Sequence, residues 1–359
     1  MIRRVEAARE AMAAAGVELL AVSPSDDLRY LVGFSPTADE RPCALLVGAA
    51  GAVFVVPALN AAQSEAALPD LDVVAWTDAD GARGAFAAAL GRFPPPRRAA
   101  VDGTMRADVL LLLQSLLPSA AFVPATAVLG ELRLRKDAGE VDALVRAAAA
   151  ADAAMRAALE ACVEGARESD VAGAATAALG AAGAETPFAS VASGPNGAFP
   201  HHHTGTRVLQ RGDLVTVDLG GRVANYWCDL TRMAHVGEPD ERDRELHDVV
   251  ERAVRAALGA ARAGATCADV DAAARAVIGD AGYAHAFVHR TGHGLGVSLH
   301  EPPWIMAGNA QPLEPGMVFS IEPGLYFPGD RGLRLEEIVV VTDGGCRVLG
   351  TLPRDVHVA

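Results

Sequence analysis

The first third of the chain alternates between alanine-rich amphipathic segments and short runs of β-branched residues. This alternation is typical of an α/β domain, in which helices pack against a sheet. It predicts a helix over residues 7–15, with further helices between the strands. The predicted strands are residues 17–22, 43–47, 53–56, 73–76, 99–102 and 121–123.

The pattern changes near residue 132, where longer helices begin. Asp137 and Glu140 have the spacing of a capping box, which predicts a long helix from there to about residue 162. Further helices are predicted over residues 240–263 and 268–282, and strands over residues 214–219, 224–233, 317–321 and 335–341. A chain of 359 residues is long enough for two domains. We place the domain boundary within residues 124–136, with one domain at 1–130 and the other at 131–359.

Charge and composition exclude several classes of protein. The 45 acidic residues outnumber the 31 basic ones, which disfavours a nucleic-acid or anionic-membrane partner. Lys136 is the only lysine; its context does not fit a phosphate-binding loop, and its polar, helix-opening segment makes it a poor nucleophile. The five cysteines are far apart, which predicts a reducing cytoplasm rather than a disulfide framework. The charged first residues lead us to expect no signal peptide, and the apolar segments are too short to span a membrane.

All ten histidines lie beyond residue 200, which indicates that the chemistry is concentrated in the second domain. A glycine-rich segment, residues 289–303, carries His289, His293 and His300. The first two have the spacing of a helical zinc pair, but the interleaved glycines disfavour a helix. We predict a loop that leads into a short strand. The zincin motif fails here, because Trp304 stands where its second histidine would be.

Asp218 and Asp229 lie in two alternating segments that predict a β-hairpin. If the two residues stand opposite each other, the turn centres between Val223 and Ala224 and both side chains share one face. Like charges at opposite positions destabilise a hairpin unless a cation lies between them. The simpler interpretation is a pair of unrelated surface carboxylates.

Two glutamates complete the set of unusual acids. Glu322 ends an apolar strand, and Glu336 lies within another predicted strand, two residues after Arg334. Acids in apolar strands need partners when they are buried, and an ion pair with Arg334 is the simpler interpretation for either one.

Taken together, the two aspartates, the two glutamates and at least one histidine form an oxygen-rich ligand set. Such a set is typical of two divalent ions bridged by carboxylates, as in two-metal aminopeptidases. Carboxylate ligands favour Mn²⁺, while one imidazole also admits Co²⁺, Zn²⁺ or Fe²⁺. Catalysis through an acyl-enzyme is less favoured, because the chain has no G-x-S-x-G motif and no cysteine beside these histidines.

In this order, the segments resemble the pita-bread metallopeptidases, the family of creatinase, aminopeptidase P, prolidase and methionine aminopeptidase. The first domain, including residues 27–34, resembles the creatinase-type N-terminal domain, and the second the pita-bread catalytic domain. The resemblance implies an α/β (α+β) fold and five metal ligands: Asp218, Asp229, His293, Glu322 and Glu336. It further implies that Asp229 and Glu336 bridge two metals, that Asp218 chelates one, and that His293 and Glu322 bind the other.

The resemblance also implies roles for residues around the metals. His201, or one of the two histidines that follow it, matches a histidine of the substrate pocket. His289 and His300 match two further histidines that flank the metals, and Arg334 matches an arginine that holds Glu336 and the neighbouring carboxylates. Glu322 is the candidate general base.

We therefore predict a cytoplasmic enzyme that hydrolyses the peptide bond preceding proline in Xaa-Pro dipeptides, by a hydroxide between two metal ions, Mn²⁺ above all. A small peptide is the expected partner, and the resemblance implies a homodimer. The five ligands disfavour the metal-free creatinase branch, and the first domain disfavours methionine aminopeptidase. Three alternatives stay open: an aminopeptidase P acting on longer peptides, a metal-dependent hydrolase of a non-peptide amide, and a metal-free binding protein.

Overall fold

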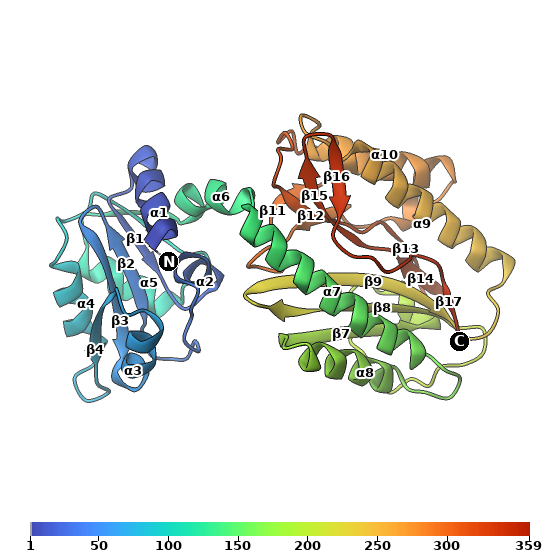
Figure 1. Cartoon of the computed structure of the whole chain (residues 1–359), viewed down its shortest axis with the longest axis horizontal. Coiled ribbons are helices and arrows are strands. Elements are labelled where there is room, and N and C mark those ends of the chain that lie inside the picture. The colour runs from blue at the N-terminus through green and yellow to red at the C-terminus, as the bar shows by residue number, and fades with distance from the viewer. Residues whose placement is uncertain (1) are drawn as a thin grey trace. The chain divides into compact units, whose positions relative to one another are not determined.

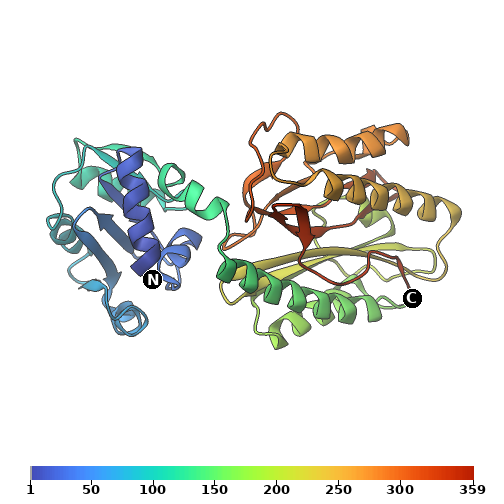
Figure 2. The same cartoon turned by 45° about the horizontal axis from the view of Figure 1, so that its top comes forward.

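The computed structural model describes residues 2–359 and divides between Arg133 and Leu134 into two compact units. Figures 1 and 2 show the chain as a ribbon, and the two units are described here one at a time. Among residues 2–359, none of the helices has the length and apolar composition that a membrane span would need.

The first unit is built on one six-stranded sheet in the order β4-β3-β2-β1-β5-β6. The strands are β1 (Leu19–Val22), β2 (Ala44–Gly48), β3 (Gly51–Pro57), β4 (Asp72–Trp76), β5 (Arg98–Val101) and β6 (Ala121–Pro124). Strands β1, β2 and β3 are antiparallel neighbours, and the outer pairings are parallel. The helices are α1 (Ile2–Ala15), α2 (Asp26–Val32), α3 (Ala58–Ala67), α4 (Ala82–Leu90), α5 (Ala107–Leu116) and α6 (Thr126–Leu134). The α/β class predicted for this part of the chain is confirmed.

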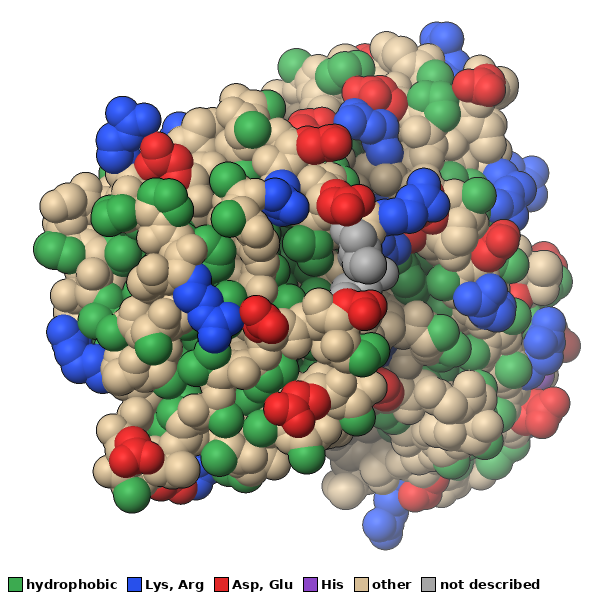
Figure 3. Space-filling model, turned by 60° about the vertical axis from the view of Figure 1, so that its left-hand side comes forward, with side chains coloured by type: hydrophobic (Ala, Val, Ile, Leu, Met, Phe, Trp, Pro, Cys, Tyr) green, Lys and Arg blue, Asp and Glu red, His purple; other side chains and the backbone are tan. Residues whose placement is uncertain are grey.

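The surface agrees with the mixed charge of the sequence. On the face shown in Figure 3, acidic and basic side chains are interspersed, and no large patch of one sign forms.

The second unit contains two pairs of helices and three sheets. The helices are α7 (Ala138–Glu160), α8 (Glu168–Ala181), α9 (Glu241–Ala260) and α10 (Cys267–Asp280). A four-stranded sheet, in the order β17-β9-β8-β7, contains β7 (Glu185–Ser193), β8 (Leu214–Val223), β9 (Tyr226–His235) and β17 (His357–Val358). A five-stranded sheet, in the order β11-β10-β12-β15-β16, contains β10 (Gly292–Gly294), β11 (Glu301–Ile305), β12 (Val318–Ile321), β15 (Glu337–Thr342) and β16 (Gly345–Val348). Strands β13 (Gly324–Phe327) and β14 (Arg331–Arg334) form a separate hairpin.

The two helix pairs enclose the strands between them, as Figure 1 shows. Helices α7 and α8 share one hydrophobic core with strands β7, β8 and β9. Helices α9 and α10 share another with β12, β13 and β15. The predicted capping box at the start of α7 is confirmed, because Asp137 Oδ1 accepts the N–H of Glu140 at 2.9 Å and Glu140 Oε2 accepts that of Asp137 at 2.9 Å. The strands between the two layers, and the segments that connect them, carry the predicted site residues.

Candidate metal centre

The hairpin of β8 and β9 brings Asp218 and Asp229 to one face, but with a register that differs from the predicted one. Asp218 is paired with Thr231, and Asp229 with Gly220, so the predicted direct pairing of the two aspartates is wrong by two residues. The reason is a two-residue turn at 224–225, where both residues have positive φ values of 49° and 72°. Because side chains alternate along a strand, a shift of two residues keeps both carboxylates on the same face.

Strand β10 positions His293, and it follows a loop as predicted. No side chain fits at Gly292, where a Cβ would lie 1.8 Å from the carbonyl oxygen of Ser320 on β12. The N–H of His293 donates to Ser320 Oγ at 3.0 Å, and its Nδ1 lies 3.1 Å from the carbonyl oxygen of Gly294. The other ring nitrogen, Nε2, lies 3.2 Å from Glu322 Oε1 and 3.7 Å from Asp229 Oδ2. His293 therefore presents Nε2 to the carboxylates.

The two glutamates lie where the chain passes between the five-stranded sheet and the hairpin of β13 and β14. Glu322 directly follows β12, as predicted. The strand predicted over residues 335–341 is found as β15, but it begins two residues later, at Glu337, and β14 ends at Arg334, so Glu336 lies between two strands instead of within one. Strand β14 pairs with β13 and β15 with β12, so the chain changes sheets at Glu336. This crossing turns Glu336 toward β9, where its Oε2 accepts the hydroxyl of Thr231 at 2.9 Å.

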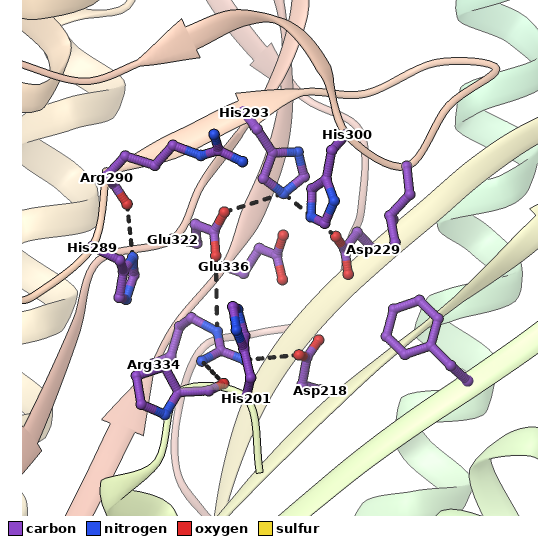
Figure 4. A pocket seen from close by; sticks show the side chains of 13 residues that line it. His201, Asp218, Asp229, His289, Arg290, His293, His300, Glu322, Arg334 and Glu336 are labelled. Atoms are coloured by element: carbon purple, nitrogen blue, oxygen red, sulfur yellow. Dashed lines mark hydrogen bonds and ion pairs between the residues drawn. The ribbon is translucent and has the colours of Figure 1, made fainter. Parts of the chain in front are cut away.

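These side chains meet in one place, as Figure 4 shows. Three groups of nitrogen and oxygen atoms lie within 4.8 Å of one another: Asp218 with Asp229 and Glu336, His293 with Glu322 and Glu336, and Asp229 with His293 and His300. Glu336 and Asp229 each belong to two of these groups. An acid shared in this way is suited to bridge two cations.

The raised pKa values of the carboxylates indicate repulsion between buried negative charges, which a bound cation would reduce. Burial, and then the charge of Glu336, raises the pKa of Asp229 well above its usual value. Burial and the charges of Glu322 and Asp218 do the same to the pKa of Glu336. Glu336 Oε1 is buried without a hydrogen-bond partner among the described residues. An unpartnered carboxylate oxygen among buried like charges fits a divalent cation.

Arg334 is the cation that the fold itself supplies. Its guanidinium donates to Asp218 Oδ2 at 2.8 Å, to Thr231 Oγ1 at 3.1 Å and to the hydroxyl of Tyr326 at 2.8 Å. We predicted that Arg334 holds Glu336 and the neighbouring carboxylates; it holds Asp218 directly and reaches Glu336 through the hydroxyl of Thr231. Tyr326, which the sequence did not single out, also lies 3.0 Å from Nε2 of His289.

A cavity of about 390 Å³ surrounds this centre, and every predicted site residue lines it. Phe188, Pro200, Arg290 and Leu299 also line it, and no pattern in the sequence indicated them. The complete lining is Phe188, Pro200, His201, Asp218, Asp229, His289, Arg290, His293, Leu299, His300, Glu322, Arg334 and Glu336.

The histidines of the cavity differ in their surroundings. Of the three consecutive histidines, His201 lines the cavity, whereas His202 Nε2 lies 3.2 Å from the buried carboxylate of Glu168. Burial lowers the pKa of His289. Partial burial and the neighbouring His293 lower the pKa of His300 to about 4. His300 is therefore neutral at neutral pH, with one ring N–H to donate.

The raised pKa values predict how the stability of the protein depends on pH once divalent cations are stripped away. Asp229 and Glu336 have higher pKa values folded than unfolded, so between these values the folded state binds more protons. The free energy of unfolding then falls as pH rises from about 4 through the folded pKa values. A bound cation removes this penalty. The rise in melting temperature caused by Mn²⁺ is therefore expected to be larger at pH 8 than at pH 5.5.

Thermal melts with and without Mn²⁺ at the two pH values check this. Glu336→Gln is the matched control, since the cation-free variant has one acid fewer and is expected to lose less stability between pH 5.5 and 8. An equal gain from Mn²⁺ at both pH values would contradict the assignment of these acids to a cation site.

Comparison with known proteins agrees with the geometry. The model of the Creatinase/Prolidase N-terminal domain matches residues 4–135, and the model of Metallopeptidase family M24 matches residues 142–343. A protein of Mycobacterium bovis named probable dipeptidase PepE is 44% identical over 362 residues, 99% of this chain and 96% of that protein. The Xaa-Pro dipeptidase of Lactobacillus delbrueckii subsp. lactis is 32% identical over 337 residues, 92% of each chain.

A solved structure shows the same fold over the whole chain. The recombinant prolidase from Thermococcus sibiricus superimposes with a TM-score of 0.93 at 32% identity, covering 99% of this chain and 98% of that one. Both domains are matched, and the four acids and the one histidine predicted as ligands meet in one cavity. The chain belongs to the M24 metallopeptidases and combines their pita-bread catalytic domain with a creatinase-type N-terminal domain.

Proposed function

We propose that this chain hydrolyses the peptide bond preceding proline in Xaa-Pro dipeptides, with two divalent metal ions held in the cavity. The observation that carries the proposal is the convergence of four carboxylates and one imidazole, with a buried oxygen of Glu336 left without a donor. The relatives named dipeptidase and Xaa-Pro dipeptidase support the same substrate class.

The proposed ligands divide between two metal positions. Asp229 and Glu336 would bridge, because each belongs to two groups of ligand atoms. Asp218 would complete one position, and His293 with Glu322 the other. We propose Mn²⁺ because carboxylates predominate. When bound, the metal pair supplies Lewis acidity, which polarises the scissile carbonyl and lowers the pKa of a water molecule.

Glu322 is the proposed proton carrier. Burial alone would raise its pKa, but the hydrogen bond and charge of His293 bring it down to about 2. Its carboxylate is therefore ionised at neutral pH, and its Oε1 also accepts the hydroxyl of Ser320 at 3.0 Å. In the proposed reaction it accepts the proton of the attacking water and passes it to the leaving nitrogen of proline.

His300 is the better placed of the two flanking histidines to donate a hydrogen bond to the substrate. His289 already has both ring nitrogens in hydrogen-bond range of other groups, at 2.7 Å from the carbonyl oxygen of Arg290 and 3.0 Å from the hydroxyl of Tyr326. His300 has an edge-on ring contact with His293, with ring centroids 4.2 Å apart. The ring N–H of His300 would stabilise the charge that develops on the carbonyl oxygen of the substrate. His289, held by its two neighbours, would form part of the cavity wall.

Arg290 supports a dipeptide rather than a longer peptide. Its guanidinium stacks on the ring of Trp304, 4.4 Å from the centroid, and lines the cavity. Within residues 2–359 it forms no ion pair, whereas Arg334 is engaged by Asp218. Figure 4 shows the Arg290 side chain extending along the cavity toward His293. A cation without an acid partner on the wall is suited to bind the free carboxylate that only a dipeptide presents beside its scissile bond.

A panel of substrates of increasing length tests the function on the Mn²⁺-loaded enzyme. Ala-Pro is expected to be cleaved with a higher kcat/KM than Ala-Pro-amide or Ala-Pro-Ala. Arg290→Met is expected to lower kcat/KM for Ala-Pro about 10- to 100-fold, the loss of one charge-assisted hydrogen bond, and to leave that for the amide unchanged.

The other outcomes of the panel identify the alternatives. Preference for Ala-Pro-Ala, unaffected by Arg290→Met, would indicate an aminopeptidase P. Cleavage of no Xaa-Pro substrate by an enzyme that binds metal would favour a hydrolase of another amide. The predicted cytoplasmic location and the homodimer stay predictions.

A further inference from the structure

The only lysine of the chain forms a buried ion pair at the base of the loop that carries His300. Lys136 Nζ lies 2.7 Å from Glu301 Oε1, and the two side chains are 2% and 5% exposed. Glu301 directly follows His300 and begins strand β11. Neither member of the pair lines the cavity. The pair therefore adjoins the site without belonging to it.

The lysine end of the pair is anchored to the five-stranded sheet. The N–H of Lys136 donates to the carbonyl oxygen of Gly316 at 2.8 Å. The N–H of Gly316 in turn donates to the carbonyl oxygen of Val341, on β15, at 3.0 Å. The two chains pack so closely that a Cβ at Gly316 would lie 2.9 Å from the carbonyl oxygen of Lys136. The ammonium is thus presented from a fixed backbone.

The glutamate end closes the loop of residues 296–301. Glu301 Oε2 accepts the N–H of Ser298 at 3.2 Å, while Oε1 receives the ammonium of Lys136. A Cβ at Gly296 would lie 2.4 Å from Glu301 Oε1 and 3.1 Å from Lys136 Cε. The start and the end of the loop are therefore packed against the same ion pair.

The tip of this loop, Leu299 and His300, lines the cavity. The ring of His300 makes no hydrogen bond to any of residues 2–359, and its described ring contact is the one with His293. The position of its ring therefore depends on the backbone that carries it and on the packing of the ring against His293. The loop is also joined to strand β9, because the carbonyl oxygen of Gly296 accepts the N–H of Trp227 at 2.9 Å.

We propose that Lys136 and Glu301 are positioning residues, whose ion pair holds the 296–301 loop so that His300 faces the substrate. The role rests on the proposed function of the cavity. Two buried charges stabilise each other only while both are present, and the loss of one leaves the other uncompensated. A displacement of a catalytic side chain by about 1 Å is enough to cost about 100-fold in rate.

The test compares Lys136→Met with Lys136→Met/Glu301→Gln. The single variant removes the ammonium that lies against a buried carboxylate and is expected to lose stability as well as rate. The double variant removes both charges at similar volume, so its melting temperature and metal content are expected to stay near those of the parent enzyme. Its kcat for Ala-Pro is nevertheless expected to fall about 10- to 100-fold, because the ammonium of Lys136 no longer holds the loop, while KM changes less than about threefold.

Two controls make the result specific. Arg135→Met breaks the neighbouring ion pair with Glu314, whose side chains are 43% and 47% exposed, and is expected to leave kcat within about twofold. In a His300→Ala background the double variant is expected to have no further effect on kcat, because the pair acts through His300.

The results distinguish a role of the ion pair in positioning His300 from a contribution to the stability of the fold alone. A kcat that recovers together with the melting temperature in the double variant would overturn the proposal, and so would an equal loss in Arg135→Met. Losses that multiply with that of His300→Ala would show that the pair does not act through His300. Where Lys136→Met is too unstable to purify, the double variant carries the test. Failure of the proposed function would be recognised by a different result, because the unmodified enzyme would then show no metal-dependent cleavage of Ala-Pro.

Discussion

Replacing Glu336 with glutamine is expected to lower kcat/KM for Ala-Pro at least about 1,000-fold, because the transition state would lose the stabilisation of the shared metal site, worth several kcal/mol. The carboxylate of Glu336 belongs to two groups of ligand atoms, so a neutral amide would weaken both metal positions at once. Metal analysis after dialysis is expected to find less Mn²⁺ bound than in the unmodified enzyme.

Removal of the metal provides the same result without a mutation. A chelator is expected to abolish cleavage, and resupplied Mn²⁺ is expected to restore it. Glu314→Gln is a suitable control, because Glu314 is exposed and lies outside the cavity, and it should retain both metal and rate. Full activity after complete demetallation would refute the metal-dependent mechanism.

His293→Ala and His300→Ala are expected to fail in different ways, although the two rings touch. His293 presents Nε2 to Asp229 and Glu322, so its removal should lower metal occupancy and, with it, the rate. His300 donates to the substrate in the proposed reaction, and its removal should leave the metal in place and lower kcat about 100- to 1,000-fold, the effect of one lost donor to a developing oxyanion.

Metal content and kcat measured on the same preparations separate the two roles. Equal metal loss in both variants would place His300 among the ligands, which its position near Asp229 and His293 allows geometrically. Unchanged kcat in a fully metallated His300→Ala enzyme would remove it from the mechanism altogether.

Local patterns were sufficient to find the acids of the site, because carboxylates in apolar strands are rare enough to stand out. They were insufficient for the register of the hairpin. The turn at Ala224 and Asn225 adopts positive φ at both residues, and asparagine tolerates that conformation, so Asn225 was a usable signal for a shorter turn. The aspartates kept a common face because the error was an even number of residues.

Contacts between distant segments explain what the sequence could not show. The orientation of Glu336 depends on a change of sheet, which is set by the pairing of β14 and β15 with different partners. Tyr326 lies in a segment with no distinguishing spacing, and only the folded chain brings it to His289. Arg290 lies within the histidine-bearing segment, but no motif distinguished it from its neighbours. Lys136 was expected in a polar, helix-opening segment, but Glu301, far along the chain, compensates its burial.

The burial of that single lysine also determines how the protein will respond to amine chemistry. With its one ε-amine 2% exposed, the native surface offers no lysine for acylating labels, cross-linkers or coupled resins. Reagents of this kind will react with the lysine side chain only when the fold opens around it. The rate at which the side chain of Lys136 becomes acetylated, followed by mass spectrometry, therefore reports how often the catalytic domain opens around this one residue.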